Sequence, residues 1–595
     1  MAQAHDPSAP ALFALAMAPK MMGCAWSWRA LPVSLITCLS LAASEVIEGS
    51  LECQPLAGPQ RHIPQFHVIP AMQNKSGTWW PGDLNDANAV FQHRGVFHIM
   101  FQTPRDPLPS GGGGSGPHAW GHVVSDDLVR WRRLPPALAP TPDSKAYDGK
   151  DGDCDGTLSF PSDLGPTILW GPDCADKWPP GREGEANRPR LGDYPRVAIA
   201  RPANISDPFL TEWAKDPQNP IAFANASTPC AFPGSVWRGQ GHWNMVCQTF
   251  GAVSGMHWGR YSTADNSLHG PWSLDDAAFA RPPASSIGVG TLSNPSFYPL
   301  PLPRTGEPTH IINTDMGCSF ALGFYSEETE RLVNLTSSSR VCNDQWFVAG
   351  VAEEDGRLLH IGWVKQWNAP PPSSKFDTPI NTMSLVRVLT YDHRAKVLVT
   401  NPATEYKSLR TATLFARSNL SLPVGIPFQL PLPSGAGAAI DLDVSFALPA
   451  GGDLSISLQV LASLKGWEGN ATTMSMNVSG TAAADGSRQG VFEIHTAREQ
   501  PVRVQQGFSI AKDEALLNLR VIVDRSIVEG FAAGGRAALH GRDYPAEGET
   551  AVRLLAPGSG PALVSHVEAW SMGCGWASSP ESISPAVADV VSVVV

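Results

Sequence analysis

Charge, helical periodicity and long apolar runs are all scarce in this chain of 595 residues. Asp, Glu, Lys and Arg make up only 16% of the residues, and the net charge of −12 is spread without long acidic or basic runs. Because nucleic-acid binding usually needs a clustered basic face, we expect no nucleic-acid partner.

The apolar run at residues 30–43 is too short for a comfortable membrane span. It follows Lys20 and Arg29 and ends in small residues, which is typical of a secretory signal. Residues 1–43 are therefore predicted to be a signal peptide or signal anchor, and residues 44–62 a short leader. We expect no stable membrane span after signal removal, and delivery to the extracellular space or, by the same pathway, to the vacuole.

Cysteines and glycosylation sequons agree with that route. Ten cysteines occur, and the even number that follows the signal permits disulfides, although the sequence does not give their connectivity. A local pair of Cys230 with Cys247 is one guess. Open Asn-x-Ser/Thr sequons, which are acceptor sites in secreted proteins, stand at Asn74, Asn204, Asn225, Asn334, Asn419, Asn470 and Asn477.

Turn formers and aromatics are abundant, with 55 Gly, 54 Pro and 19 Trp. They favour an all-β protein, and the length favours two domains. Residues 63–395 alternate short strands with turns, without sustained helical periodicity. Residues 405–575 alternate apolar and polar residues over many strands, which predicts a β-sandwich. Residues 576–595 form a tail to which the sequence assigns no role.

Residues 82–102 predict a β-hairpin with the carboxylate of Asp86 at its mouth. Asparagines on either side of this aspartate tolerate tight backbone conformations. A strand starts at Val90, residues 93–95 form a turn, and residues 96–102 return as an apolar, β-prone strand.

This segment resembles the opening motif of glycoside hydrolase family 32, the invertases and fructan hydrolases. That family has Trp-x-Asn-Asp-Pro-Asn-Gly and then a return strand ending Phe-Tyr-Gln; here residues 85–89 are Asn-Asp-Ala-Asn-Ala and residues 100–102 are Met-Phe-Gln. Residues 118–131 and 523–545 also resemble family motifs, so the resemblance spans about residues 63–575. It implies an all-β fold, a five-bladed β-propeller followed by a β-sandwich.

The resemblance also implies a chemistry. Retaining hydrolysis of a glycosidic bond needs two carboxyl groups about 5–5.5 Å apart, one as nucleophile and one as acid. Asp86 matches the family nucleophile, for a β-fructofuranosidase acting on sucrose or a fructan. Asn85 and Gln102 match positions around the fructosyl pocket, although a turn former and a strand end also explain them.

Two of the three carboxylate motifs of the family are altered. The Arg-Asp-Pro position carries Ala231 and Phe232, whose side chains form no hydrogen bond to a sugar hydroxyl. The acid position carries Ser293, and serine is a poor proton donor at neutral pH. Since a general acid is typically worth roughly 10²–10⁴ in rate, the alternative is a non-catalytic carbohydrate-binding protein on the same scaffold. A third possibility is hydrolysis of another glycoside with a relocated acid.

Asp155 replaces a serine that lines the sugar pocket in the family. Our first hypothesis is that its carboxylate binds a sugar hydroxyl, and our second is that it acts as the general acid. The alternative is a turn aspartate in the acidic loop at residues 151–155. This loop has only part of the calcium-binding pattern, so we expect no metal, and we expect no cofactor.

Overall fold

The structure is a computed structural model that describes residues 59–69, 71–73, 79–81, 84–104, 118–139, 153–160, 164–172, 196–223, 230–250, 256–280, 295–314, 318–337, 340–343, 347–364, 381–464, 466, 469–496, 498, 503–558 and 560–575. The predicted signal, the tail, and the leader up to residue 58 lie outside these ranges. Regular structure within them is almost entirely β-strand, as the composition predicts. No helix in these ranges has the length and apolar character needed to cross a membrane.

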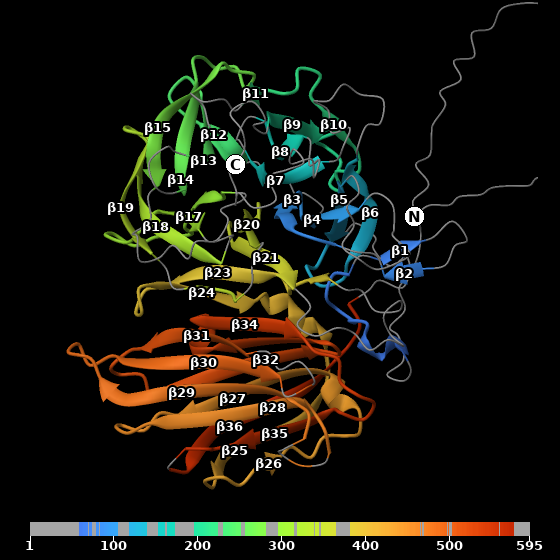
Figure 1. The fold of residues 1–595 in the computed structure, drawn as a ribbon, viewed down its shortest axis with the longest axis vertical. Coiled ribbons are helices and arrows are strands. Elements are labelled where there is room, and N and C mark those ends of the chain that lie inside the picture. The colour runs from blue at the N-terminus through green and yellow to red at the C-terminus, as the bar shows by residue number, and fades with distance from the viewer. Residues whose placement is uncertain are drawn as a thin grey trace, which may run out of the picture. The chain divides into compact units, whose positions relative to one another are not determined.

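The described part of residues 87–402 forms five antiparallel sheets, each built mainly from four strands (Figure 1). The first two sheets comprise β3 (Ala87–His93), β4 (Val96–Pro104), β5 (His118–Ser125) and β6 (Arg132–Leu138), then β7 (Asp153–Ser159), β8 (Thr167–Pro172), β9 (Arg196–Pro202) and β10 (Trp213–Lys215), with β11 (Ala222–Phe223) beside β9. The third and fourth comprise β12 (Cys230–Arg238), β13 (Trp243–Phe250), β14 (Met256–Thr263) and β15 (Trp272–Ala280), then β16 (Phe297–Pro299), β17 (His310–Thr314), β18 (Ser319–Ser326) and β19 (Arg331–Ser337). The fifth comprises β20 (Phe347–Val351), β21 (Leu358–Val364), β23 (Arg387–Asp392) and β24 (Val397–Pro402), with β22 (Thr382–Met383) beside β21.

The first strands of these sheets pack against one another. Strand β3 contacts both β7 and β20, and β12 contacts both β7 and β16. Sheets repeated radially around their first strands are the arrangement of a β-propeller, so the predicted propeller is confirmed. Its last sheet ends at Pro402, which corrects the predicted boundary at residue 395.

Strand β20 approaches β3 so closely that only glycine fits at one position. A Cβ atom added to Gly350 would lie 1.6 Å from the backbone oxygen of Val90. A glycine inside a strand often marks such an approach of two backbones. The fifth sheet therefore packs directly on the first.

The predicted hairpin is formed by β3 and β4. His93 pairs with Val96, and the two-residue turn between them has positive φ at Arg94 (50°) and Gly95 (82°). Positive φ at both turn residues matches the right-handed twist of the flanking strands. Strand β3 begins at Ala87 rather than at the predicted Val90, because a register shift lets the earlier residues pair with β4.

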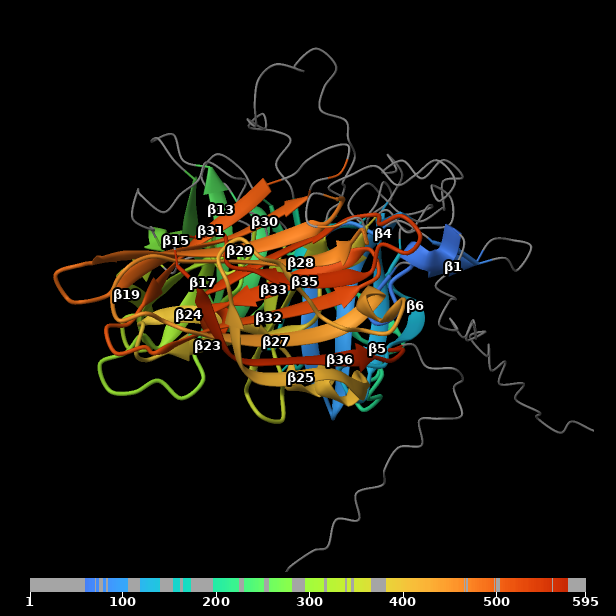
Figure 2. The same ribbon diagram turned by 90° about the horizontal axis from the view of Figure 1, so that it is seen from below.

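The second domain is a β-sandwich, as predicted. One six-stranded sheet has the order β25-β36-β27-β32-β33-β34 and the other has the order β26-β35-β28-β29-β30-β31, and Figure 2 shows them stacked. Their bounds are β25 (Arg410–Leu422), β26 (Phe428–Gln429), β27 (Ala439–Ala447), β28 (Leu454–Ala462), β29 (Thr472–Ala482), β30 (Arg488–Thr496), β31 (Arg503–Ile510), β32 (Leu516–Asp524), β33 (Ile527–Ala532), β34 (Ala537–Arg542), β35 (Ala551–Leu555) and β36 (Ala562–Met572).

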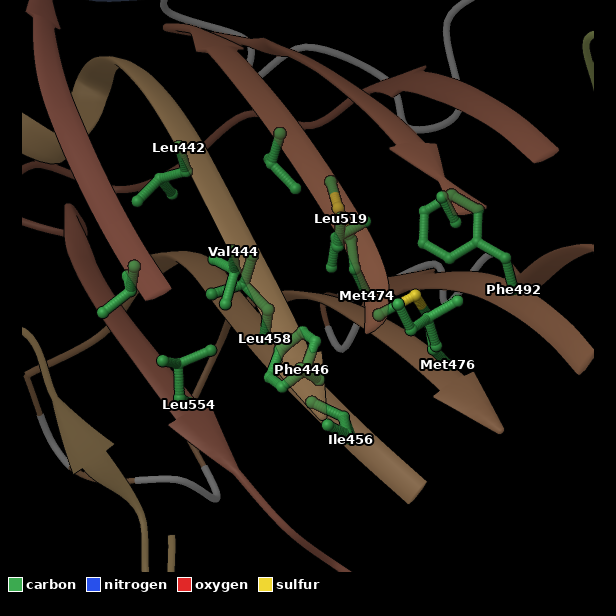
Figure 3. Packing of buried hydrophobic residues seen from close by; sticks show 14 of the residues in the cluster. Leu442, Val444, Phe446, Ile456, Leu458, Met474, Met476, Phe492, Leu519 and Leu554 are labelled. Carbon is green, nitrogen blue, oxygen red and sulfur yellow. The ribbon is translucent and has the colours of Figure 1, made fainter. Parts of the chain in front are cut away.

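The sandwich core forms because alternate residues of both sheets point inward. Leu442, Val444 and Phe446 of β27 are fully buried. They face Ile456 and Leu458 of β28 across the interior, as Figure 3 shows. Removal of apolar surface from water stabilises a fold by about 25 cal/mol per Å². Burial of the apolar residues between the two sheets is therefore the main driving force for folding of the sandwich.

A buried network of charged residues joins the two domains. Glu529 Oε2 accepts a hydrogen bond from Arg387 Nη2 at 2.7 Å, and Glu529 Oε1 lies 3.1 Å from His67 Nε2. His67 Nδ1 lies 2.7 Å from Asp524 Oδ2. Asp524 and Glu529 thus have a structural role, because their carboxylates connect segments of the two domains.

The end of the predicted leader packs on the sandwich. His62 is buried, with Nε2 placed 2.8 Å from the carbonyl oxygen of Pro545. Its own carbonyl accepts a hydrogen bond from Ser526 Oγ at 2.7 Å. The boundary at residue 62 therefore falls inside a packed segment.

Four cysteines of the described residues are in disulfides. Cys318 bonds to Cys342, and Cys247 and Cys574 are also disulfide-bonded. Disulfides persist in oxidising compartments, so these bonds agree with a secretory route.

Candidate active site

Three of the predicted site residues meet at the mouth of the β3–β4 hairpin. The backbone N–H of Asn85 donates to the carbonyl of Gln102 at 2.9 Å, and the N–H of Gln102 donates to the carbonyl of Asp86 at 2.9 Å. Asp86 is 4% exposed and Gln102 is 5% exposed. The backbone that carries the motif carboxylate is thus fixed by ladder-type hydrogen bonds just before the innermost strand of the first sheet.

Asn88 is a buried residue of the same segment that the sequence did not single out as a candidate for the site. It occupies the register shift between Ala87 and Ala89, where β3 has one more residue than β4 opposes. Its side chain is fully buried, and neither of its amide atoms has a hydrogen-bond partner among the described residues; the same holds for Asn85 Oδ1. Leaving a buried polar group unsatisfied costs about 1–3 kcal/mol, so these amides keep hydrogen-bonding capacity for a polar ligand or water.

Two further inner strands shift register near their first residues. Strand β7 shifts between Asp153 and Gly156, a segment that contains Asp155. Strand β12 shifts between Cys230 and Pro233, a segment that contains Ala231 and Phe232. Bulges are over-represented next to active sites because they change the direction of a side chain.

Not every predicted site position is described to the same depth. For Asp155, Ala231 and Phe232 the structure describes the backbone but not the side chains. Ser293 lies outside the described residues. The hairpin residues are therefore brought together, while the contacts of the altered positions stay predictions.

Serine side chains connect the inner strands. Ser159 Oγ of β7 accepts a hydrogen bond from Val236 N of β12 at 2.9 Å. Ser235 Oγ of β12 accepts one from Phe297 N near the start of β16, also at 2.9 Å. These bonds fix the spacing of the strands that precede and follow the altered motifs. No local sequence signal distinguishes such serines, because their partners are distant in the chain.

Tyr298 is excluded as a relocated acid. Its hydroxyl donates to the carbonyl of Leu158 at 3.1 Å, and burial raises the pKa of Tyr298 above its usual value. A general acid works best with a pKa near the operating pH. Among the described residues, no group of three or more His, Cys, Asp or Glu is arranged to hold a metal ion.

Comparison with known protein families identifies the class of this two-domain fold as a glycosyl hydrolase. The description "Glycosyl hydrolases family 32 N-terminal domain" matches residues 80–402, and "Glycosyl hydrolases family 32 C terminal" matches residues 405–571. This chain belongs to glycoside hydrolase family 32.

Individual relatives match along most of their length. The insoluble beta-fructofuranosidase isoenzyme CWINV6 of Arabidopsis thaliana is 24% identical over 553 residues, covering 82% of this chain and 93% of the relative. Insoluble isoenzyme 1 of Oryza sativa subsp. indica is 26% identical over 603 residues, covering 91% and 97%. The crystal structure of fructan 1-exohydrolase IIa from Cichorium intybus matches with a TM-score of 0.68 at 22% identity, covering 87% and 98%. The two-domain fold is therefore shared with that structure.

Proposed function

We propose that this chain recognises the fructosyl unit of a β-fructoside, such as sucrose or a fructan, at the start of β3. The observation that carries the proposal is the buried Asp86, whose carbonyl accepts a hydrogen bond from Gln102 N–H while the carbonyl of Gln102 accepts one from Asn85 N–H. In a retaining reaction Asp86 attacks the anomeric carbon and forms a covalent glycosyl intermediate while the glycosidic C–O bond breaks and the leaving oxygen takes up a proton; water then hydrolyses the intermediate and frees the carboxylate. Asn85 and Gln102 bind sugar hydroxyls beside it.

The neighbouring inner strands support the same location. Strands β3, β7 and β12 pack in succession, and each has its bulge near its first residues. Because a propeller repeats one up-and-down unit about an axis, the first strands of its sheets begin at the same end. Asp155 on β7 and Phe232 on β12 are therefore expected to border the sugar that Asp86 contacts.

The second candidate is binding of the same sugar without hydrolysis. Ala231, Phe232 and Ser293 favour it, because no carboxyl group stands at the positions of the acid and of the hydroxyl-binding aspartate. Loss of the acid alone lowers the rate by roughly 10²–10⁴, and lost contacts to sugar hydroxyls add several kcal/mol to the barrier. Recognition of the sugar is common to both candidates, and turnover separates them.

We also propose that the protein enters the secretory pathway and acts outside the cell. The relatives named as insoluble isoenzymes, the disulfide of Cys318 with Cys342, and the predicted signal over residues 1–43 support this route. Delivery to the vacuole is the alternative destination. Locating the full chain, tagged at its C-terminus, by microscopy of secreting cells distinguishes the two.

The proposed site is tested by incubating purified protein with sucrose and with inulin and measuring released fructose. Asp86→Asn keeps the shape of the side chain but removes the nucleophile, so any turnover should fall to background. The matched control is Asp485→Asn, an exposed turn residue of the sandwich, which should leave turnover unchanged. Calorimetric titration with the same sugars measures binding in all three proteins.

Each result has a definite meaning. Fructose release that disappears in Asp86→Asn supports hydrolysis with Asp86 as nucleophile. Binding without fructose release, weakened by Asn85→Ala or Gln102→Ala, supports the second candidate. Release that persists in Asp86→Asn, or no binding of either sugar, overturns the site.

A further inference from the structure

Asn419 lies on the outermost strand of one sandwich sheet. Strand β25 is the first strand in the order β25-β36-β27, and it pairs on one side with β36. Asn419 is exposed and has a positive φ of 55°. It begins the sequon Asn419-Leu420-Ser421. An acceptor asparagine thus projects from the edge of a sheet.

The two faces of β25 differ around this residue. Leu420 and Leu422 are buried and belong to the sandwich core. Asn419 and Ser421 are exposed, and Ser421 pairs with Leu563 of β36, which is itself 44% exposed. Apolar surface is therefore exposed on the same side of the sheet as Asn419.

More apolar surface follows at the end of the strand. Val424 is 45% exposed and Ile426 is 60% exposed. Residues 418–426 contain no charged side chain. Sheet edges that lack charged residues can pair with another chain, and natural proteins protect such edges.

We propose that Asn419 carries an N-linked glycan that covers Leu563, Val424 and Ile426 and blocks the open edge of β25. The proposal rests on the proposed entry into the secretory pathway. The donor is an oligosaccharide carried on a lipid diphosphate. The bond from Asn419 Nδ2 to the first sugar carbon forms, the bond from that carbon to the diphosphate oxygen breaks, and the amide nitrogen loses one proton.

Two other described sequons, at Asn477 and Asn204, lack this combination, whereas Asn334 also lies exposed on an outermost strand, β19, with a positive φ of 54°. Asn477 lies on β29, which has strands on both sides, and its Oδ1 accepts a hydrogen bond from Ser455 Oγ at 2.6 Å. Asn204 Oδ1 accepts one from the backbone N–H of Ser206 at 3.0 Å, in a turn. A glycan on either residue would leave the edge of β25 uncovered, so both serve as comparison sites.

The test uses the full chain secreted from a eukaryotic host and compares three substitutions. Ser421→Ala destroys the sequon but keeps Asn419, Ser421→Thr keeps the sequon, and Asn419→Gln removes the acceptor. Intact mass is measured with and without endoglycosidase treatment. Ser421→Ala and Asn419→Gln should both lose one glycan-sized step that Ser421→Thr retains. Light scattering at increasing concentration should show self-association only in the two variants that lose the glycan.

The possible outcomes separate this inference from the secretory route. If endoglycosidase shifts the parent but Ser421→Ala has the mass of the parent, other sequons are modified and Asn419 is not. If the full chain is not secreted at all, the secretory route fails; if it is secreted but endoglycosidase shifts no protein, the proposed modification alone fails. If the glycan step is lost without any change in self-association, the covering role is overturned while the modification stands.

Discussion

Buried carboxylates in the two domains are held in different ways. In the sandwich, Asp524 accepts hydrogen bonds from three successive backbone N–H groups, those of Gln65, Phe66 and His67. In the propeller, the carbonyl of Asp86 accepts a hydrogen bond from the backbone N–H of Gln102, and the buried amide atoms of Asn88, two residues further on, have no partner among the described residues. The first arrangement uses the carboxylate itself to join two segments, whereas the second fixes the backbone that carries the carboxylate.

This contrast shows why burial of a carboxylate alone does not identify a catalytic group. Burial by itself would raise the pKa of Glu529, but the Arg387 guanidinium and the hydrogen bond from His67 hold it well below its usual range. Glu529 therefore stays ionised and serves as a fixed counter-charge. A group that has to exchange protons during turnover needs a pKa closer to the operating pH.

The largest effect should come from breaking the sandwich network. Glu529→Gln leaves the fully buried Arg387 without its counter-charge. Removing one partner of a buried ion pair costs about 3–5 kcal/mol, so the midpoint of denaturant unfolding should fall steeply. Chemical denaturation followed by tryptophan fluorescence measures this change.

The matched control is Glu493→Gln in the same domain. Glu493 pairs with Arg503, whose side chain is largely exposed. Exposed pairs are worth about 0–1 kcal/mol, so the midpoint should barely move. If Glu529→Gln behaved like Glu493→Gln, the network would have no stabilising role at the junction.

A smaller effect should come from the contact between propeller strands. Gly350→Ala places a methyl group against the backbone oxygen of Val90, which forces β20 away from β3. Overpacking of this kind typically costs about 1–3 kcal/mol. Gly451→Ala in the sandwich adds a methyl group with no atom within 4 Å, so its melting temperature should match that of the parent. Equal melting temperatures for the two variants would show that β20 can move away from β3 without a loss of stability.

Local sequence features were sufficient to predict much of the fold. The turn at Arg94 and Gly95 and the alternating strands of the sandwich follow from residue type and spacing. Two boundaries did not follow. Strand β3 starts early because of a bulge, and the propeller extends to Pro402 because β24 forms a hairpin with β23, which pairs in turn with the earlier strand β21. The residue types of these segments reveal neither the bulge nor the pairing with β21.

The candidate site was predictable only where a motif carried it. Asp86, Asn85 and Gln102 were selected through the resemblance, and the structure brings their backbones together. Asn88 and Ser235 were missed, because burial without a partner and hydrogen bonds across strands depend on the tertiary fold. Neither property can be derived from one residue and its sequence neighbours.

The smallest expected effect is a pH dependence that His67 gives to the junction. Burial alone would lower the pKa of His67, but hydrogen bonds to Asp524 and Glu529 raise it above its usual value. A histidine whose pKa is higher in the folded state than in the unfolded state stabilises the fold. The whole of this contribution is present below the unfolded pKa of about 6.5. The contribution is then lost, at up to about 1.4 kcal/mol per pH unit, as the pH rises through the folded pKa.

That loss can be isolated by working above pH 6.5. His122, His310 and His540 have pKa values lowered by burial, to about 3, about 4 and about 3, so they are neutral in the folded state there and affect stability only on acidification. The melting temperature of the parent should fall between pH 6.5 and 8, whereas His67→Gln should start lower and show a flatter slope. His566→Gln, at an exposed position, should keep the parental slope. A parental slope in His67→Gln would mean that the histidine is not charged between its two carboxylates, and the junction would then depend on Arg387 and Glu529 alone.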